Sequence, residues 1–144
     1  MKVLVQRVSQ AAVTVGGERI GEIKRGLLAF VGVFPEDGDA EINWLAAKTL
    51  GLRIFPDDDK NMNLSVVDVQ GSVLVVSQFT LAANTSKGMR PGFSGAATPA
   101  HAEVIYDQYV AKLSKHVSVA TGQFGADMQV SLINDGPVTI LLER

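Results

Sequence analysis

Short runs of apolar, mostly β-branched residues alternate with turn residues along most of the chain, and this pattern predicts a protein built largely of strands. The continuous apolar runs Leu27–Val33 and Val73–Val76 indicate buried strands, whereas Met128–Leu132 alternates and indicates a half-buried one. Gly16-Gly17 predicts a hairpin turn. Further strands are expected at Lys2–Val8, Ala12–Val15, Arg19–Ile23, Leu52–Phe55, Ser65–Val69, Val117–Ala120 and Val138–Leu142.

Two segments have the spacing of amphipathic helices instead. The first follows Asp37-Gly38-Asp39, which offers a turn and an N-cap. It places apolar residues at helical spacing over Ile42–Thr49 and reaches a C-terminal cap at Gly51. The second begins at Thr98-Pro99, an N-cap followed by a proline at the first helical position, and ends near Lys115.

About nine or ten strands with two helices predict an α/β fold. We expect a single domain, residues 1–144, of mixed β-sheets in a layered, β-β-α, barrel-like arrangement, because this length suits one domain with a sizeable core. No apolar run approaches the roughly 18–20 residues of a membrane span. The chain has no cysteine, which excludes a disulfide framework, a thiolate nucleophile and a cysteine-based metal site. A cytoplasmic location is the expectation.

Polar chemistry is concentrated where the central apolar run ends. Val73–Val76 is followed at once by Ser77, Gln78, Phe79 and Thr80. A buried strand that ends in such a cluster delivers donors and acceptors to the edge of a rigid sheet, where sites are commonly built. The alternative is that the two hydroxyls merely satisfy backbone groups at a strand end.

The long irregular segment 82–98 follows, rich in glycine, serine and threonine. It carries Lys87 and Arg90 beside glycines, which allow backbone and cations to approach a ligand closely. The alternative is a plain surface loop. A net charge of −2 argues against a broad phosphate-binding surface, but leaves room for a small contact with a nucleic-acid end.

The usual catalytic equipment is missing from the sequence. The two histidines, His101 and His116, are not in a metal-ligand motif, and no P-loop or dinucleotide fingerprint is present. Hydroxyls, an amide, two cations and backbone N–H groups remain. Such a site can orient a substrate and stabilise an oxyanion, but must obtain its base from the substrate or from water.

Four motifs, in order along the chain, resemble those of the D-aminoacyl-tRNA deacylases. They are SQFTL at 77–81, KGMRPGF at 87–93, TGQFGA at 121–126 and NDGPVT at 134–139, after an N-terminal MKVLVQRV. The resemblance runs from end to end. It implies an enzyme that hydrolyses the ester between a D-amino acid and the terminal adenosine of tRNA, with activity on glycyl-tRNA as well.

The resemblance also implies a homodimer with two active sites at the subunit interface. Gly136-Pro137 would form a Gly-cisPro motif that reaches into the partner's pocket, although the local sequence by itself favours a trans-proline hairpin turn. Enantiomers differ by exchanging hydrogen and side chain at Cα, so a wall of backbone atoms close to Cα would exclude the L form. Glycine has no side chain to clash with that wall.

Residue roles follow from the same resemblance. Ser77, Gln78, Phe79 and Thr80 would hold the adenosine and the ester, with Thr80 orienting the substrate while the ribose 2′-OH or a water molecule supplies the attacking group. The expected substrate-binding residues are Gly136, Pro137, Lys87, Arg90, Phe93 and Ile133. Neither a cofactor nor a metal is expected, and the expected partner is the 3′ end of aminoacyl-tRNA, with no membrane and no DNA.

Two other functions fit some of these features. A non-catalytic dimeric module that binds a tRNA end or an adenosine-like ligand would explain the missing base and the modest number of cations. An amidohydrolase with a threonine nucleophile would require a base that the sequence does not reveal.

Overall fold

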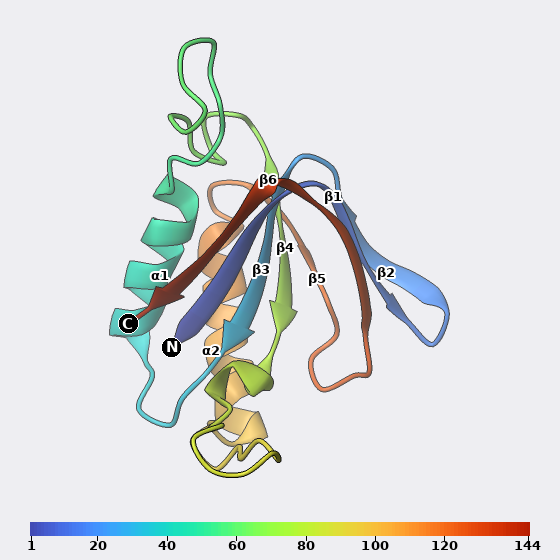
Figure 1. Cartoon of the computed structure of the whole chain (residues 1–144), viewed down its shortest axis with the longest axis vertical. Helices are drawn as coiled ribbons and strands as arrows, with labels where there is room; N and C mark the ends of the chain where they lie inside the picture. The colour runs from blue at the N-terminus through green and yellow to red at the C-terminus, as the bar shows by residue number, and fades with distance from the viewer.

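The computed structural model describes residues 1–144 as six strands, two α-helices and one 3-10 helix (Figure 1). In chain order these are β1 Lys2–Val15, β2 Glu18–Ile23, β3 Gly26–Gly32, α1 Asp39–Gly51, β4 Ser72–Ser77, η1 Phe79–Ala82, α2 Pro99–Leu113, β5 Ser118–Thr121 and β6 Gln129–Glu143. None of the helices combines the length and the apolar composition that a membrane-spanning segment requires.

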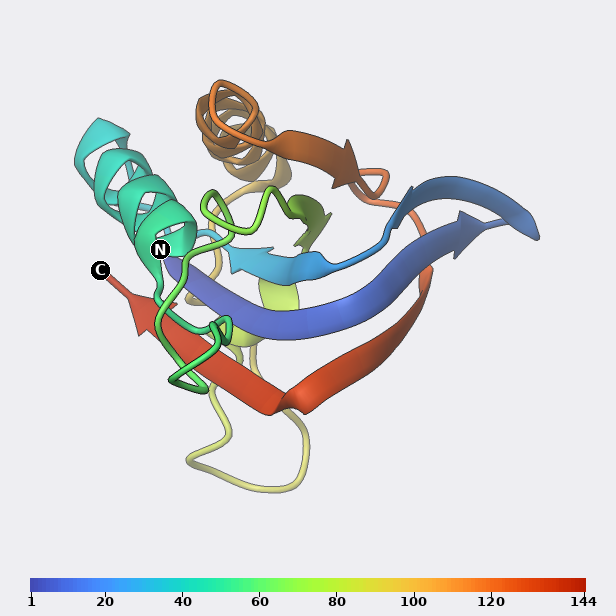
Figure 2. The same cartoon turned by 90° about the horizontal axis from the view of Figure 1, so that it is seen from above.

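All six strands belong to one mixed sheet of order β2-β1-β3-β4-β5, with β6 paired to the other edge of β1. β1 is long enough to pair with β3 along its first half and with β2 along its second half. These pairs and β1–β6 are antiparallel, whereas β3–β4 and β4–β5 are parallel. The sheet curves strongly, so the arrangement is barrel-like, as predicted (Figure 2).

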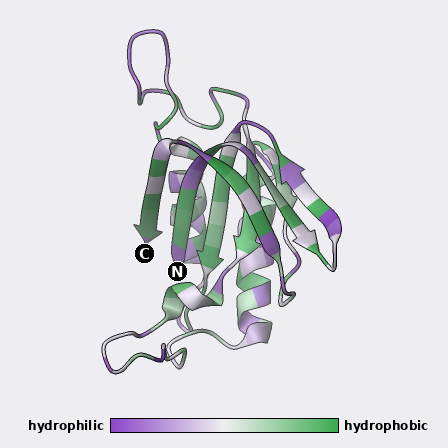
Figure 3. Cartoon of the chain, turned by 45° about the vertical axis from the view of Figure 1, so that its right-hand side comes forward, coloured by the Kyte–Doolittle hydropathy of each residue, from purple (hydrophilic) through white to green (hydrophobic).

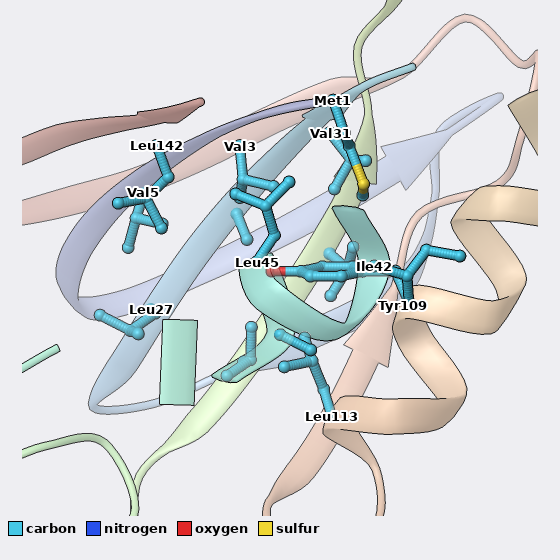
Figure 4. Packing of buried hydrophobic residues seen from close by; sticks show 14 of the residues in the cluster. Met1, Val3, Val5, Leu27, Val31, Ile42, Leu45, Tyr109, Leu113 and Leu142 are labelled. Atoms are coloured by element: carbon cyan, nitrogen blue, oxygen red, sulfur yellow. The ribbon is translucent and has the colours of Figure 1, made fainter. Parts of the chain in front are cut away.

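Two apolar clusters pack on the two faces of this sheet, because successive strand residues point to opposite sides. Leu27 and Val73 face α1 and α2, where Leu45 and the fully buried Tyr109 complete the larger cluster (Figure 4). Leu74 faces the other side, in a smaller cluster that the curled ends of β1 and β6 help to cover. The continuous apolar runs are therefore buried strands, as predicted, and Figure 3 shows the apolar residues following the strands.

The predicted number of strands is wrong, because β1 and β6 are each continuous. The polar pair Ser9 and Gln10 does not end β1; the strand continues through it with shifts of register against β6. The hairpin turn that the local sequence favours at Gly136-Pro137 is not formed; these residues lie inside β6, next to the same shifts of register. Pairing with a long partner strand outweighs these local turn signals.

Two short predicted strands are not strands either. Leu52–Phe55 makes only the isolated bridge between Phe55 and Leu64. Ser65–Val69 forms a turn, because the Ser65 amide and hydroxyl both donate to the Asp68 carboxylate, at 2.8 and 2.7 Å. These hydrogen bonds also lower the pKa of Asp68.

Both helices begin where the caps were predicted. Gly38 is the N-cap of α1, and its amide donates to the Glu41 carboxylate at 3.0 Å, which lowers the pKa of Glu41. Thr98 is the N-cap of α2, and its hydroxyl accepts a hydrogen bond from the His101 amide. α2 ends at Leu113, two residues before the predicted end.

Candidate active site

The polar cluster lies where β4 ends against β3. Ser77 is the last residue of β4, and the Gln78 amide still donates to the Val31 carbonyl, at 2.7 Å. The chain then turns into η1, which packs against Gly32. A Cβ at position 32 would lie 2.8 Å from the Leu81 Cβ, so only glycine allows η1 to approach β3 so closely.

The Thr80 hydroxyl has a defined orientation. The Gln78 side-chain amide donates to Thr80 Oγ1 at 2.6 Å, so the hydroxyl is an acceptor there and its own proton is free to donate outward. The neighbouring Phe79 ring is 59% exposed and meets the Phe93 ring edge-on, with 5.0 Å between centroids. The cluster can therefore orient a polar substrate and offer it an aromatic surface.

A pocket of about 580 Å³ opens beside this cluster. Its lining is mostly apolar and comes from the ends of β3 and β4, η1, α2 and the segment leading into β6. Tyr106 forms part of the wall and donates its hydroxyl to the Val75 carbonyl at 2.8 Å. Burial raises the pKa of Tyr106, so it is neutral there. An apolar cavity with a few polar groups at its mouth is the usual form of a small-ligand site.

Ionisable groups are scarce around this pocket. Apart from Tyr106, the only one in the lining is the Asp127 carboxylate, and no lysine, arginine or histidine lines it. No three histidine, cysteine, aspartate or glutamate side chains come together anywhere in the chain in a way that could hold a metal ion.

A second feature is built around the buried cation Arg7. Its Nε donates to the Asp135 carbonyl at 3.1 Å and pairs with the Asp135 carboxylate at 3.2 Å, and its Nη1 donates to the Ile54 carbonyl. Arg7 therefore holds the segment that carries Gly136 and Pro137. The peptide bond between those two residues is cis, and both are exposed.

The structure brings together only some of the predicted site residues. Ser77, Gln78, Phe79 and Phe93 line the pocket, and Thr80 lies beside them. Lys87 and Arg90 lie outside the lining, at the exposed end of a loop.

Gly136, Pro137 and Ile133 lie elsewhere in the same chain. Asn134 pairs with Val8, and Val8 pairs with Gly26 at the start of β3, whereas Ser77 pairs with Val31 near its end. The five-residue step from Gly26 to Val31 along β3 spans about 17 Å. The bend of β6 accordingly lies toward one end of the molecule, and η1 lies toward the other (Figure 1).

Sequence patterns missed three residues that shape these features. Gly32 and Tyr106 looked like ordinary strand and helix-core positions. Arg7 offered a signal, since it is a cation within the apolar run Lys2–Val8, and a buried cation requires partners.

Comparison with known proteins gives consistent matches along the whole chain. The family model described as D-Tyr-tRNA(Tyr) deacylase matches residues 4–143. A "D-aminoacyl-tRNA deacylase" of Alteromonas mediterranea is 60% identical and covers 94% of each chain, and one of Pseudomonas aeruginosa is 57% identical and covers 99% of each.

Two solved structures share the fold of this chain. The "c-Myc DNA Unwinding Element Binding Protein" superposes with a TM-score of 0.94 at 43% identity, covering 100% of this chain and 99% of the other. A "probable eukaryotic D-amino acid tRNA deacylase" has the same fold, with a TM-score of 0.84 at 16% identity and coverage of 98% and 97%. The family match and the relatives of 57–60% identity identify the protein as a hydrolase. The chain belongs to the D-Tyr-tRNA(Tyr) deacylase family.

Proposed function

We propose that residues 1–144 act as one catalytic domain that hydrolyses the ester of D-aminoacyl-tRNA, releasing the free D-amino acid and tRNA. The observation that carries this proposal is the oriented Thr80 hydroxyl at the mouth of an apolar pocket, in a chain that belongs to a deacylase family from end to end. With tRNA as the proposed substrate, we expect the reaction in the cytoplasm, and the proposal requires no cofactor.

The geometry favours an orienting role for Thr80. No group that could act as a general base contacts its hydroxyl, whose one partner is the Gln78 amide. The first hydrogen bond of η1 runs from the Leu81 amide to the Gln78 carbonyl, so the Phe79 and Thr80 amides precede it and have no partner within η1. In our proposal these donors polarise the ester carbonyl, and water or the ribose 2′-OH supplies the attacking oxygen.

The chiral filter is proposed to come from a second copy of the chain. Gly136 and Pro137 are exposed and held by Arg7, but they lie far from the pocket of their own chain. A homodimer of two-fold symmetry would let each segment close the partner's pocket. Main-chain atoms close to Cα would then reject L-aminoacyl esters, tolerate many D side chains, and admit glycine.

The decisive measurement is deacylation of D-tyrosyl-tRNA compared with L-tyrosyl-tRNA. We expect rapid hydrolysis of the D ester, none above background for the L ester, and intermediate hydrolysis of glycyl-tRNA. Equal rates for the two enantiomers, or no hydrolysis of the D ester, would refute the proposal.

The role of Thr80 is tested separately. Thr80→Ala should lower the rate but leave it measurable, because the hydroxyl orients rather than attacks. Accumulation of an acyl-enzyme on the unaltered protein would instead identify Thr80 as a nucleophile.

The absence of a base beside Thr80 favours one other function, a non-catalytic module that binds a tRNA end. Such a module would bind D-tyrosyl-tRNA saturably without releasing the amino acid, so the deacylation assay separates the two. One structural relative is named for binding a DNA element. We expect no comparable DNA binding here, since the net charge is −2, and a gel-shift assay with duplex and single-stranded DNA tests this.

A further inference from the structure

We propose that residues 84–92, here called the rim loop, bind the single-stranded RNA nucleotides that precede the terminal adenosine. Lys87 and Arg90 would contact phosphates, and Met89 would pack against a base. This inference rests on the proposed function and names a part of the substrate that the pocket itself does not reach.

The rim loop has the architecture of a projecting arm. Asn84 and Gly92 exchange two backbone hydrogen bonds, at 2.8 and 2.9 Å, which close the base of the loop. Inside it, the Asn84 side-chain oxygen accepts a hydrogen bond from the Ser86 amide at 3.0 Å, and Gly88 turns the chain with a φ of +68°. Residues 87–90 are thereby held away from the body of the protein, at the lower end of Figure 1.

The tip of the rim loop combines two cations with an apolar side chain. Lys87 and Arg90 are exposed, and neither forms an ion pair within the chain. Met89 lies between them and is 99% exposed, so it packs against nothing in its own chain. Phosphates suit the two cations, and a thioether packs favourably against an aromatic ring such as a nucleobase.

The rim loop stands at the mouth of the pocket. Gly92 leads directly to Phe93, whose ring contacts Phe79, and Asn84 follows Thr80 by four residues. An RNA strand whose terminal aminoacyl ester is bound beside Thr80 would therefore leave the pocket next to the rim loop. RNA is a polyanion, but the pocket lining contains no cation and includes the Asp127 carboxylate. The positive charges near the pocket residues in sequence are those of Lys87 and Arg90 in the rim loop.

Comparison of two substrates separates the rim loop from the pocket. D-tyrosyl-tRNA carries the preceding nucleotides, whereas 3′-O-D-tyrosyl-adenosine lacks them. For the double variant Lys87→Ala/Arg90→Ala we expect the ratio of kcat/KM for tRNA to kcat/KM for the adenosine ester to fall. The control Lys60→Ala/Lys115→Ala removes two exposed cations that lie outside the rim loop, one between α1 and β4 and one just after α2, and should keep the wild-type ratio.

Salt dependence gives the expected magnitude. Each phosphate contact to a single strand contributes about 0.7 to the slope of log affinity against log salt, so loss of two contacts should flatten the slope by about 1.4. A fourfold rise in salt should then lower kcat/KM for tRNA about sevenfold more in the wild type than in the double variant.

Met89 is tested by a pair of substitutions. Met89→Ser should lower the preference for tRNA several-fold without altering the salt slope, because it removes apolar contact rather than charge. Met89→Leu should restore most of that preference. Equal behaviour of the serine and leucine variants would overturn the assignment of Met89.

The outcomes distinguish the two proposals. If the wild type hydrolyses both substrates while the Lys87→Ala/Arg90→Ala variant keeps the wild-type ratio and salt slope, the rim-loop inference is wrong and the proposed function stands. A parallel loss on both substrates would show that the loop supports the pocket, which also overturns the inference. If the wild type hydrolyses neither substrate, the proposed function is wrong and the inference falls with it.

Discussion

Arg7 connects the main chain at two positions that are far apart in sequence, Ile54 and Asp135. Arg7→Lys keeps the charge but cannot reproduce the fork of donors. We expect it to destabilise the protein by about 2 kcal/mol, the value of hydrogen bonds to a charged group. If Asp135–Pro137 forms the chiral wall, the preference for D over L esters should fall about tenfold, or about 1.4 kcal/mol.

The matched control for this substitution is Arg19→Lys. Arg19 pairs with Glu22 at 2.8 Å, but both side chains are more than 60% exposed, so we expect a change of at most about 0.5 kcal/mol. Urea denaturation measures stability, and the deacylation assay measures enantioselectivity. An Arg7→Lys protein with the wild-type D/L ratio would show that Arg7 does not position the wall.

Gly32 makes a different kind of contribution, because it is the absence of a side chain that positions η1. In Gly32→Ala the new Cβ would meet the Leu81 Cβ at 2.8 Å and the Gln78 carbonyl at 3.2 Å, so η1 must move. A displacement near 1 Å lowers catalysis about 100-fold, and we expect kcat to fall by about 10- to 100-fold with a smaller change in KM.

Gly51→Ala is the control for Gly32→Ala. A Cβ at position 51 would meet no atom within 4 Å, and the residue lies at the end of α1, so activity should stay at the wild-type level. Stopped assays at saturating and at low substrate separate kcat from kcat/KM. Wild-type kcat in Gly32→Ala would mean that η1 tolerates the displacement.

Single site residues could be predicted from the sequence where their chemistry differs from that of the neighbouring residues. Ser77–Thr80 could be recognised because four residues with polar or aromatic chemistry end an apolar run. The roles of Gly32 and Arg7 could not, since each depends on an atom from another element: Leu81 for one, and Ile54 and Asp135 for the other.

The two helices are joined by one buried polar contact. The Thr49 and Tyr109 hydroxyls lie 2.7 Å apart, and Tyr109 is fully buried. Tyr109→Phe leaves the Thr49 hydroxyl without its partner, and we expect a loss of about 1–2 kcal/mol in unfolding free energy. The double variant Thr49→Val/Tyr109→Phe should regain part of that loss, because no polar group is then left unpaired.

A double-mutant cycle in urea measures this coupling. Additive losses in the double variant would show that the two hydroxyls do not interact in solution. Activity should change little in either single variant, since neither residue lines the pocket.

The ends of helices and strands could be predicted where the residues close to each end determine them. Thr98 caps α2 as predicted, and the N-cap of α1, Gly38, lies within the predicted segment Asp37–Asp39, because capping depends on residues within one turn. The lengths of β1 and β6 were not predictable in this way. Their continuity depends on pairing between the two ends of the chain, which the breaks at Ser9-Gln10 and at residues 134–137 conceal.

At the scale of the whole molecule, the fold class followed from the balance of strands and helices, but the sheet order did not, since no local pattern reveals which strand joins β1. The same topology separates the two halves of the proposed site. In a dimer of two-fold symmetry, each complete site would take Gln78 from one subunit and Gly136 from its partner.

Mixed dimers test this arrangement. We expect Gln78→Ala to disable the pocket side. Gly136→Val should prevent the segment from closing the partner's pocket, because Gly136 has a φ of +126° and valine does not adopt it readily. Random pairing of the two chains makes half of the dimers mixed, and each mixed dimer has one intact site, so about one quarter of wild-type activity should return.

Co-expression of the two variants with different purification tags provides the measurement. Each variant alone supplies the baseline. A mixture no more active than the sum of those baselines would show either that one subunit supplies both parts of the site or that the segment with Gly136 is not part of the site.

The hydrogen bonds from Arg7 to main-chain oxygens have a consequence for which positions of this protein tolerate substitution. A carbonyl group is present whatever residue occupies position 54, so a library randomised there should yield many functional clones, restricted to apolar residues because Ile54 is buried. Position 135 should tolerate fewer substitutions, because the Asp135 carboxylate also pairs with Arg7. At position 7 arginine should be strongly preferred, with lysine as a weaker substitute that keeps the charge but not the fork of donors. The proposed chiral filter would therefore tolerate substitution at position 54 but lose selectivity through a single substitution of Arg7.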